Sequence, residues 1–138
     1  MSYADLKSGA VINYPCLWSR EASRGETEGR KYRPSAVAVR VPRAGKSDLV
    51  ILFPITTKEP EANRLASEIP ETEKRRAGLD TILRQWIILD ECNEETIPGS
   101  YYLEPETPLG HFSKKFFLPL IREFIMRRET VQIISRRD

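Results

Sequence analysis

Two residues suited to holding a phosphate lie at the ends of apolar runs. Arg33 closes the basic segment Gly-Arg-Lys-Tyr-Arg and precedes the apolar run of residues 35–39. Thr56 follows a second apolar run, residues 49–53, within Pro-Ile-Thr-Thr. If the two runs are neighbouring strands, Arg33 and Thr56 meet at one edge of a sheet. A guanidinium donates to two phosphate oxygens at once, and a hydroxyl adds another donor, so the pair predicts an anion site.

The other chemically reactive side chains are few. Cys16 and Cys92 fit no metal-ligand spacing, and with His111 as the single histidine the sequence predicts no metal site. We expect both cysteines to be buried, free thiols. The imidazole of His111 suits acid–base chemistry, but this residue lies outside the two segments above. Trp18 and Trp86 are expected in the core or at an interface rather than as platforms for bases.

Length and composition predict a soluble protein with one domain. The chain has 138 residues, of which 40% are hydrophobic and 30% charged, so residues 1–138 are expected to form a single domain. No apolar run approaches the roughly 20 residues of a membrane helix. The first residues are polar and lack the apolar core of a signal peptide, so we expect a cytoplasmic protein without membrane contact.

Charge is distributed unevenly along the chain. The formal net charge is +2, yet residues 20–43 contain seven basic side chains against three glutamates. Residues 90–106 contain six acids and no base. This asymmetry indicates a positive and a negative face, and two ordinary solvated surfaces are the alternative.

The elements expected to position Arg33 and Thr56 are strands. Apolar residues predict a first strand over residues 9–18, where Pro15 forces a bulge or an edge position. The second strand spans residues 35–41 and the third residues 48–55, whose continuous apolar run indicates burial on both faces. Between the first and second strands, residues 19–32 form a polar loop of a length that is usually functional or disordered.

The second half of the chain predicts shorter elements and one longer helix. They are a strand at residues 66–69, a helix at 71–77 stopped by Gly78, a strand at 84–89 continued by 90–93, and a brief strand at 101–103. An apolar stripe from Phe117 to Ile125 predicts a helix over residues 118–128 with Pro119 in its first turn. A basic tail follows at residues 130–138. The expected fold is a β-rich α+β fold, a curled antiparallel sheet or partial barrel with a C-terminal helix.

The ordered set of these segments resembles the MazF/PemK family of toxin–antitoxin growth inhibitors. The set consists of Gly9 opening a strand, Arg33-Pro34, Pro54-Ile55-Thr56, the Ala-Ser-Glu-Ile-Pro of residues 66–70, Gly78-Leu79 and Trp86-Ile87-Ile88-Leu89. It covers roughly residues 6–125 and is closest to a longer PemK-like branch that carries Leu17-Trp18 before the loop. The segments at residues 20–31 and 97–117 are longer than in compact members of the family.

This resemblance implies an SH3-like barrel, a homodimer and metal-independent endoribonuclease activity on single-stranded RNA, without a cofactor. It also implies inhibition of growth until a cognate antitoxin binds. Family members rely on the arginine of the Arg-Pro pair and on the threonine that closes the third strand, which are Arg33 and Thr56 here. Further RNA contacts are expected at Arg24, Arg30, Lys31 and Thr57.

Metal-free cleavage of RNA can use the adjacent 2′-hydroxyl as the nucleophile. Such a site must remove the hydroxyl proton, stabilise the charged phosphorane and protonate the leaving oxygen. We assign charge stabilisation to Arg33 and a hydrogen bond to a phosphate oxygen to Thr56. Glu28 or Glu21 in the polar loop is the expected general base.

Two other functional classes remain open from the sequence. One is a non-enzymatic toxin of the same fold, similar to CcdB, which binds DNA gyrase; the Arg33 and Thr56 pair argues against it because gyrase binding needs no phosphate site. The other is an inactive relative that only binds RNA or protein. Structural roles also compete: Arg33 as an exposed loop residue held extended by Pro34, and Thr56 as a turn residue at a strand end.

Overall fold

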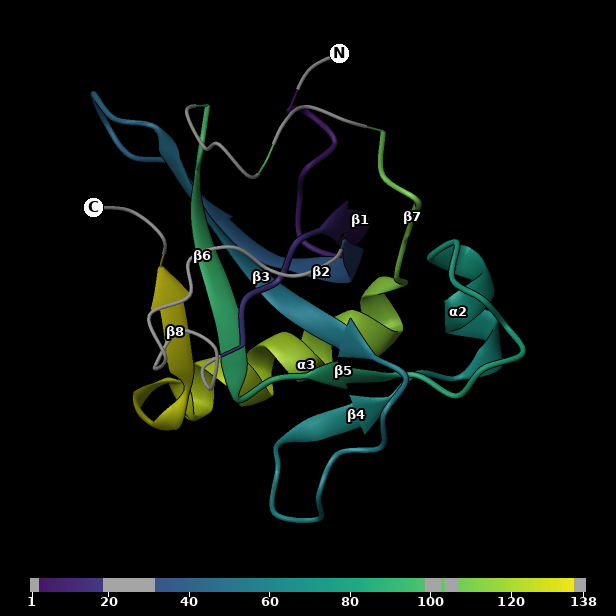
Figure 1. Ribbon diagram of the computed structural model, residues 1–138. Helices are drawn as coiled ribbons and strands as arrows, with labels where there is room; N and C mark the ends of the chain where they lie inside the picture. The colour runs from purple at the N-terminus through teal and green to yellow at the C-terminus, as the bar shows by residue number, and fades with distance from the viewer. Residues whose placement is uncertain (1–2, 19–31, 99–102, 104–106, 136–138) are drawn as a thin grey trace.

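The two longest apolar runs form the central strands of a curled sheet (Figure 1). The computed structural model describes residues 3–18, 32–98, 103 and 107–135. Its strands are β1 Ala10–Tyr14, β2 Arg33–Val41, β3 Asp48–Thr56, β4 Ala66–Glu68, β5 Trp86–Ile88, β6 Glu91–Ile97, β7 Gly110–His111 and β8 Gln132–Ser135. Its helices are α2 Glu71–Arg76 and α3 Lys114–Met126, followed by a 3-10 turn at Arg128–Thr130.

The sheet follows the order β4-β5-β3-β2-β1-β7, and β6 joins β3 to β8. The pairs along the main path and the β3–β6 pair are antiparallel, whereas β6 and β8 run parallel. The predicted α+β fold with a curled, mainly antiparallel sheet and a C-terminal helix is therefore confirmed. The parallel β6–β8 pair was not predicted. Strand β8 lies within residues 130–138, which were expected to be a basic tail without a defined structure.

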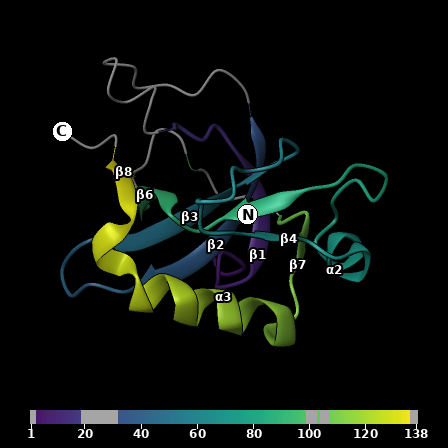
Figure 2. The ribbon, with the colours of Figure 1, turned by 90° about the horizontal axis from the view of Figure 1, so that it is seen from below.

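Hydrophobic clusters cover both faces of β2 and β3, as the apolar run predicted. On one face, Phe53 packs against Phe117 and Phe124 of α3, with ring centroids 6.4 and 5.0 Å apart. Figure 2 shows α3 running across this face. On the other face, Val50 and Leu52 join a second cluster with residues from β1. Side chains alternate between faces along a strand, so one continuous apolar run supplies both clusters.

Helix α3 begins four residues earlier than the stripe predicted. Ser113 has extended backbone angles, and its hydroxyl accepts a hydrogen bond from the Phe116 amide at 3.2 Å, which makes it the N-cap. The Ser113 hydroxyl also donates to the Glu73 carboxylate at 2.7 Å. Pro119 consequently lies inside the helix rather than in its first turn. The prediction was wrong because the cap is a polar signal outside the apolar stripe.

Other boundaries differ where proline or a bend interrupts a pattern. The first strand ends at Tyr14, before Pro15, rather than extending to residue 18. The strand predicted over residues 84–93 is two strands, because the chain bends at residues 89–90 between β5 and β6. The expected helix stop at Gly78 is confirmed by its φ of 72°, a left-handed conformation that favours glycine. The strand predicted at residues 101–103 lies outside the described residues except for Leu103, which is not in a strand.

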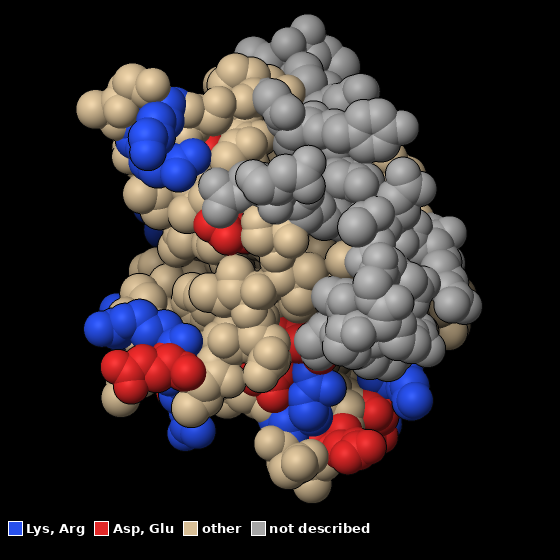
Figure 3. All heavy atoms as spheres, turned by 60° about the vertical axis from the view of Figure 1, so that its left-hand side comes forward, with Lys and Arg blue, Asp and Glu red and all other residues tan. Residues whose placement is uncertain are grey.

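The acidic segment does not form a solvated negative face throughout. Glu91 and Glu95 of β6 are only 8% and 3% exposed, so that prediction was wrong for these two residues. The Tyr14 hydroxyl donates to the Glu95 carboxylate. On the face drawn in Figure 3, described acidic and basic side chains lie beside one another, with neutral residues between them. The basic residues between positions 20 and 31, which were expected to contribute to a positive face, lie outside the described residues.

No helix among the described residues is long and apolar enough to cross a membrane.

Candidate anion-binding site

A pocket of about 410 Å³ lies where β2 begins and β3 ends. Its walls are Trp18 after β1, Arg33, Ile88 of β5, residues 56–61, and the neighbouring Asn63 and Arg64. This volume is in the range of small-ligand sites. The pocket therefore brings together residues from four separate parts of the chain.

Strand register explains why Arg33 and Thr56 meet. Ser35 is paired with Pro54 and Ala36 with Phe53, and two further steps along this register place Arg33 opposite Thr56. Residues opposite each other in an antiparallel pair share one face. Arg33 is also paired with Tyr14 of β1, so it is the first residue of β2. The alternative that treats Arg33 as an exposed loop residue is wrong.

The Arg33 guanidinium is half-buried and incompletely satisfied. Its Nε atom is buried and has no hydrogen-bond partner among the residues that the structure describes. Its guanidinium carbon lies 5.6 Å from the centroid of the Trp18 ring, within the range of a cation–π contact. A buried donor without a partner costs about 1–3 kcal/mol. Because Arg33 also lines the pocket, its guanidinium is the candidate donor to a ligand oxygen there.

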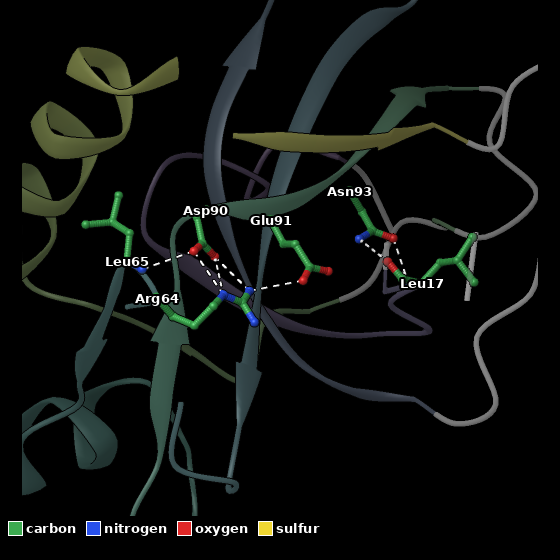
Figure 4. A network of polar contacts seen from close by, with 6 residues as sticks. All are labelled: Leu17, Arg64, Leu65, Asp90, Glu91 and Asn93. Atoms are coloured by element: carbon green, nitrogen blue, oxygen red, sulfur yellow. Dashed lines mark hydrogen bonds and ion pairs between the residues drawn. The ribbon is translucent and has the colours of Figure 1, made fainter. Parts of the chain in front are cut away.

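Trp18 is held beneath Arg33 by an amide clamp. Asn93 is 2% exposed, and its side chain accepts from the Leu17 amide and donates to the Leu17 carbonyl, both at 2.9 Å. Figure 4 shows this reciprocal pair. Because the clamp fixes the backbone of the residue directly before Trp18, β6 helps to position the indole.

The Thr56 hydroxyl accepts one hydrogen bond and can still donate another. Its Oγ1 accepts from the Lys58 amide at 3.1 Å, which leaves the hydroxyl proton available for a ligand. The exposed Thr57 lies on the same wall. Lys58 and Arg33 add positive charge to the pocket, which Glu59 and Glu61 also line.

Arg64 anchors the segment that forms this wall (Figure 4). Its Nε donates to both Asp90 oxygens at 2.9 and 3.1 Å, and its Nη2 donates to Asp90 at 2.7 Å and to Glu91 at 3.0 Å. Asp90 also accepts from the Leu65 amide at 3.0 Å. Burial opposes ionisation of Asp90, but the hydrogen bonds from Arg64 and from the Leu65 amide outweigh it and lower the pKa of Asp90. The Asp90 hydrogen bond likewise raises the pKa of Arg64.

We expect Asp90→Asn to lower the free energy of unfolding at neutral pH by about 1.5–3 kcal/mol, the usual contribution of hydrogen bonds to a charged group. The lowered pKa means that this increment is present above the ordinary Asp value of 3.8 and is lost as the pH falls through the lowered value. Urea unfolding of both proteins across acidic and neutral pH measures it. Curves that stay parallel through the acidic range would contradict the assignment. Asp80→Asn, at an exposed position outside the pocket, is the control.

The structure brings together three of the predicted site residues: Arg33, Thr56 and Thr57. The remaining five, Arg24, Arg30, Lys31, Glu21 and Glu28, lie outside the described residues. His111 is exposed on β7 and does not line the pocket.

Sequence reasoning missed Trp18, Lys58 and Arg64 as pocket residues. The expectation of a buried Trp18 is confirmed, since it is 8% exposed, but it also supports the site arginine. Lys58 and Arg64 lie in a connection without periodicity, so no pattern could single them out. For Trp18, the one available signal in the sequence was the Leu17-Trp18 pair directly before the polar loop.

Both cysteines are buried and free, as expected. Burial, with a smaller effect of Glu94 and Glu91, raises the pKa of the Cys92 thiol to about 12, so it stays protonated and is not a nucleophile. No group of three potential metal ligands occurs within the described ranges.

Comparison with known proteins does not assign a family or a function to this pocket. No family model matches the chain, and no curated protein is significantly similar to it.

Proposed function

We propose that this protein is a toxin-type endoribonuclease that cleaves single-stranded RNA without a metal ion. The observation that carries the proposal is the guanidinium of Arg33, whose buried Nε has no hydrogen-bond partner among the described residues, in one pocket with the hydroxyl of Thr56. A guanidinium and a hydroxyl in one pocket are suited to an anion whose charge increases during the reaction. The resemblance to the MazF/PemK family supplies the substrate class.

In the proposed reaction, the 2′-oxygen forms a bond to phosphorus while the bond from phosphorus to the 5′-oxygen breaks. The 2′-hydroxyl proton passes to a general base, for which Glu28 and Glu21 remain the candidates, and the 5′-oxygen takes up a proton as it leaves. Arg33 stabilises the phosphorane, and Thr56 donates to one of its oxygens. The products are a 2′,3′-cyclic phosphate and a 5′-hydroxyl.

The same proposal includes an SH3-like barrel that forms a homodimer in the cytoplasm and is neutralised by an antitoxin. Arg24, Arg30, Lys31 and Thr57 would supply affinity for the RNA backbone rather than chemistry. An acidic segment of the antitoxin would compete for these cations. Light scattering tests the homodimer, and inhibition of RNA cleavage by an acidic protein encoded beside this chain tests the antitoxin.

Incubation of the purified protein with total RNA in EDTA tests the activity. Discrete fragments with 2′,3′-cyclic phosphate ends are the expected result. Intact RNA together with gyrase-linked DNA breaks would instead support the CcdB-like alternative. RNA that is bound but uncut would support the inactive relative.

We expect Thr56→Val to lower the rate of RNA cleavage about ten- to a hundredfold with little change in stability. Valine keeps the β-branched shape at the end of β3, and only the hydroxyl is lost. A hydrogen bond to a charged group contributes about 1.5–3 kcal/mol, which gives this range. Single-turnover cleavage measures it, with Thr96→Val in β6 as the control outside the pocket. An unchanged rate would assign Thr56 a structural role.

A further inference from the structure

Arg64 has donors that its ion pairs leave unused. Its Nε and Nη2 are engaged by Asp90 and Glu91, whereas its Nη1 makes no hydrogen bond with any residue in the described part of the chain. Figure 4 shows the nitrogen without a dashed line turned away from both carboxylates. Because Arg64 also lines the pocket, its Nη1 is the donor that remains for a ligand there.

The ion pairs prepare Arg64 for such a contact. Three hydrogen bonds to Asp90 and one to Glu91 fix the plane of the guanidinium, so little side-chain freedom remains to be lost when a ligand binds. The two carboxylates also offset its positive charge. Arg64 therefore provides a directional contact, and attraction at longer range is left to Arg33 and Lys58.

Two guanidinium groups reach one pocket from different elements. Arg33 comes from the start of β2, and Arg64 comes from the segment before β4. A ligand with anionic groups at two points along its length uses both, and a single-stranded nucleic acid carries such groups along its backbone.

We propose that Arg64 binds the phosphate next to the scissile one and so requires a ligand with consecutive phosphates. This rests on the proposed function, because it takes the ligand of Arg33 to be RNA. The contact positions the strand, and Arg33 and Thr56 act on the reacting phosphate.

Binding of a short 2′-fluoro single-stranded RNA, which lacks the nucleophile, tests the contact by itself. We expect Arg64→Gln to weaken binding about ten- to a hundredfold and to reduce the slope of log affinity against log salt by about 0.7. The matched control is Arg84→Gln. Arg84 is also held in two bonds by a carboxylate, that of Glu68 at 2.8 and 2.9 Å, but it does not line the pocket. Its variant should bind like the wild type.

Neutral methylphosphonate linkages, introduced one at a time around the mapped cleavage site, locate the contact. One linkage beside the scissile phosphate should weaken binding to the wild type but not to Arg64→Gln, because both changes remove the same contact. Equal affinity of Arg64→Gln and wild type, an equal loss in Arg84→Gln, or strict additivity at every linkage overturns the proposal. If Arg64→Gln does not fold in thermal unfolding, Arg64→Lys, which keeps the charge but loses the fork, is judged by the same comparison.

The two proposals fail separately. If RNA is bound with the expected dependence on Arg64 but is never cut, the proposed nuclease activity is wrong and the Arg64 contact stands. The methylphosphonate linkages are then placed around the segment of RNA that the protein binds. If RNA is cut normally and Arg64→Gln binds it as tightly as the wild type does, only the Arg64 contact is wrong.

Discussion

Arg33→Ala should lower the single-turnover rate of RNA cleavage at least about a hundredfold and leave the protein folded. Removal of one donor that stabilises a transition-state charge typically costs about a hundred- to a thousandfold in rate. The cost in stability should be within about 1 kcal/mol, because the lost contact with Trp18 is offset by removal of a buried donor that has no partner in the described part. Arg33→Lys should also be strongly impaired, since an ammonium cannot reproduce the planar fork.

The control for Arg33 is Arg43→Ala. Arg43 is also partly buried and donates to the Ser47 carbonyl at 2.9 Å in the β2–β3 turn, outside the pocket. This variant should cleave RNA at the wild-type rate. Cleavage by folded Arg33→Ala at the wild-type rate would remove Arg33 from the mechanism.

Asn93→Leu should have the largest effect on stability among the variants considered. Leucine has a similar volume but cannot pair with the Leu17 backbone, so one amide and one carbonyl lose their partner in a buried site. At about 1–3 kcal/mol for each group, the free energy of unfolding should fall by about 2–6 kcal/mol. Urea unfolding measures this loss.

The same variant should also lose cleavage, because Trp18 no longer holds a fixed position beneath Arg33. Cleavage is measured at a temperature where circular dichroism shows the variant folded. Asn13→Leu makes the same chemical change at an exposed position of β1 and is the control. Equal stability of Asn93→Leu and wild type would show that the clamp contributes nothing.

The sequence by itself determined the centre of the fold and the pair at its edge. The apolar runs of β2 and β3 are long, and the turn between them sets an antiparallel pairing in which apolar residues face both clusters. Local periodicity therefore sufficed to predict that Arg33 and Thr56 lie at the same edge. It did not predict the β-bulge between Val37 and Val39, which shifts the register by one residue and so brings Arg33 opposite Thr56, nor that Arg33 belongs to the strand.

Only the tertiary structure decided what surrounds that pair. Asn93 reaches Leu17 across 76 positions of the chain, and Arg64 reaches Asp90 across 26. The parallel β6–β8 pair similarly joins Asn93 to Ile134. Hydrophobic periodicity records which face of its own element a residue occupies, whereas these contacts depend on which elements meet. For this reason, acids that looked solvated in sequence, Glu91 and Glu95, proved to be buried on β6.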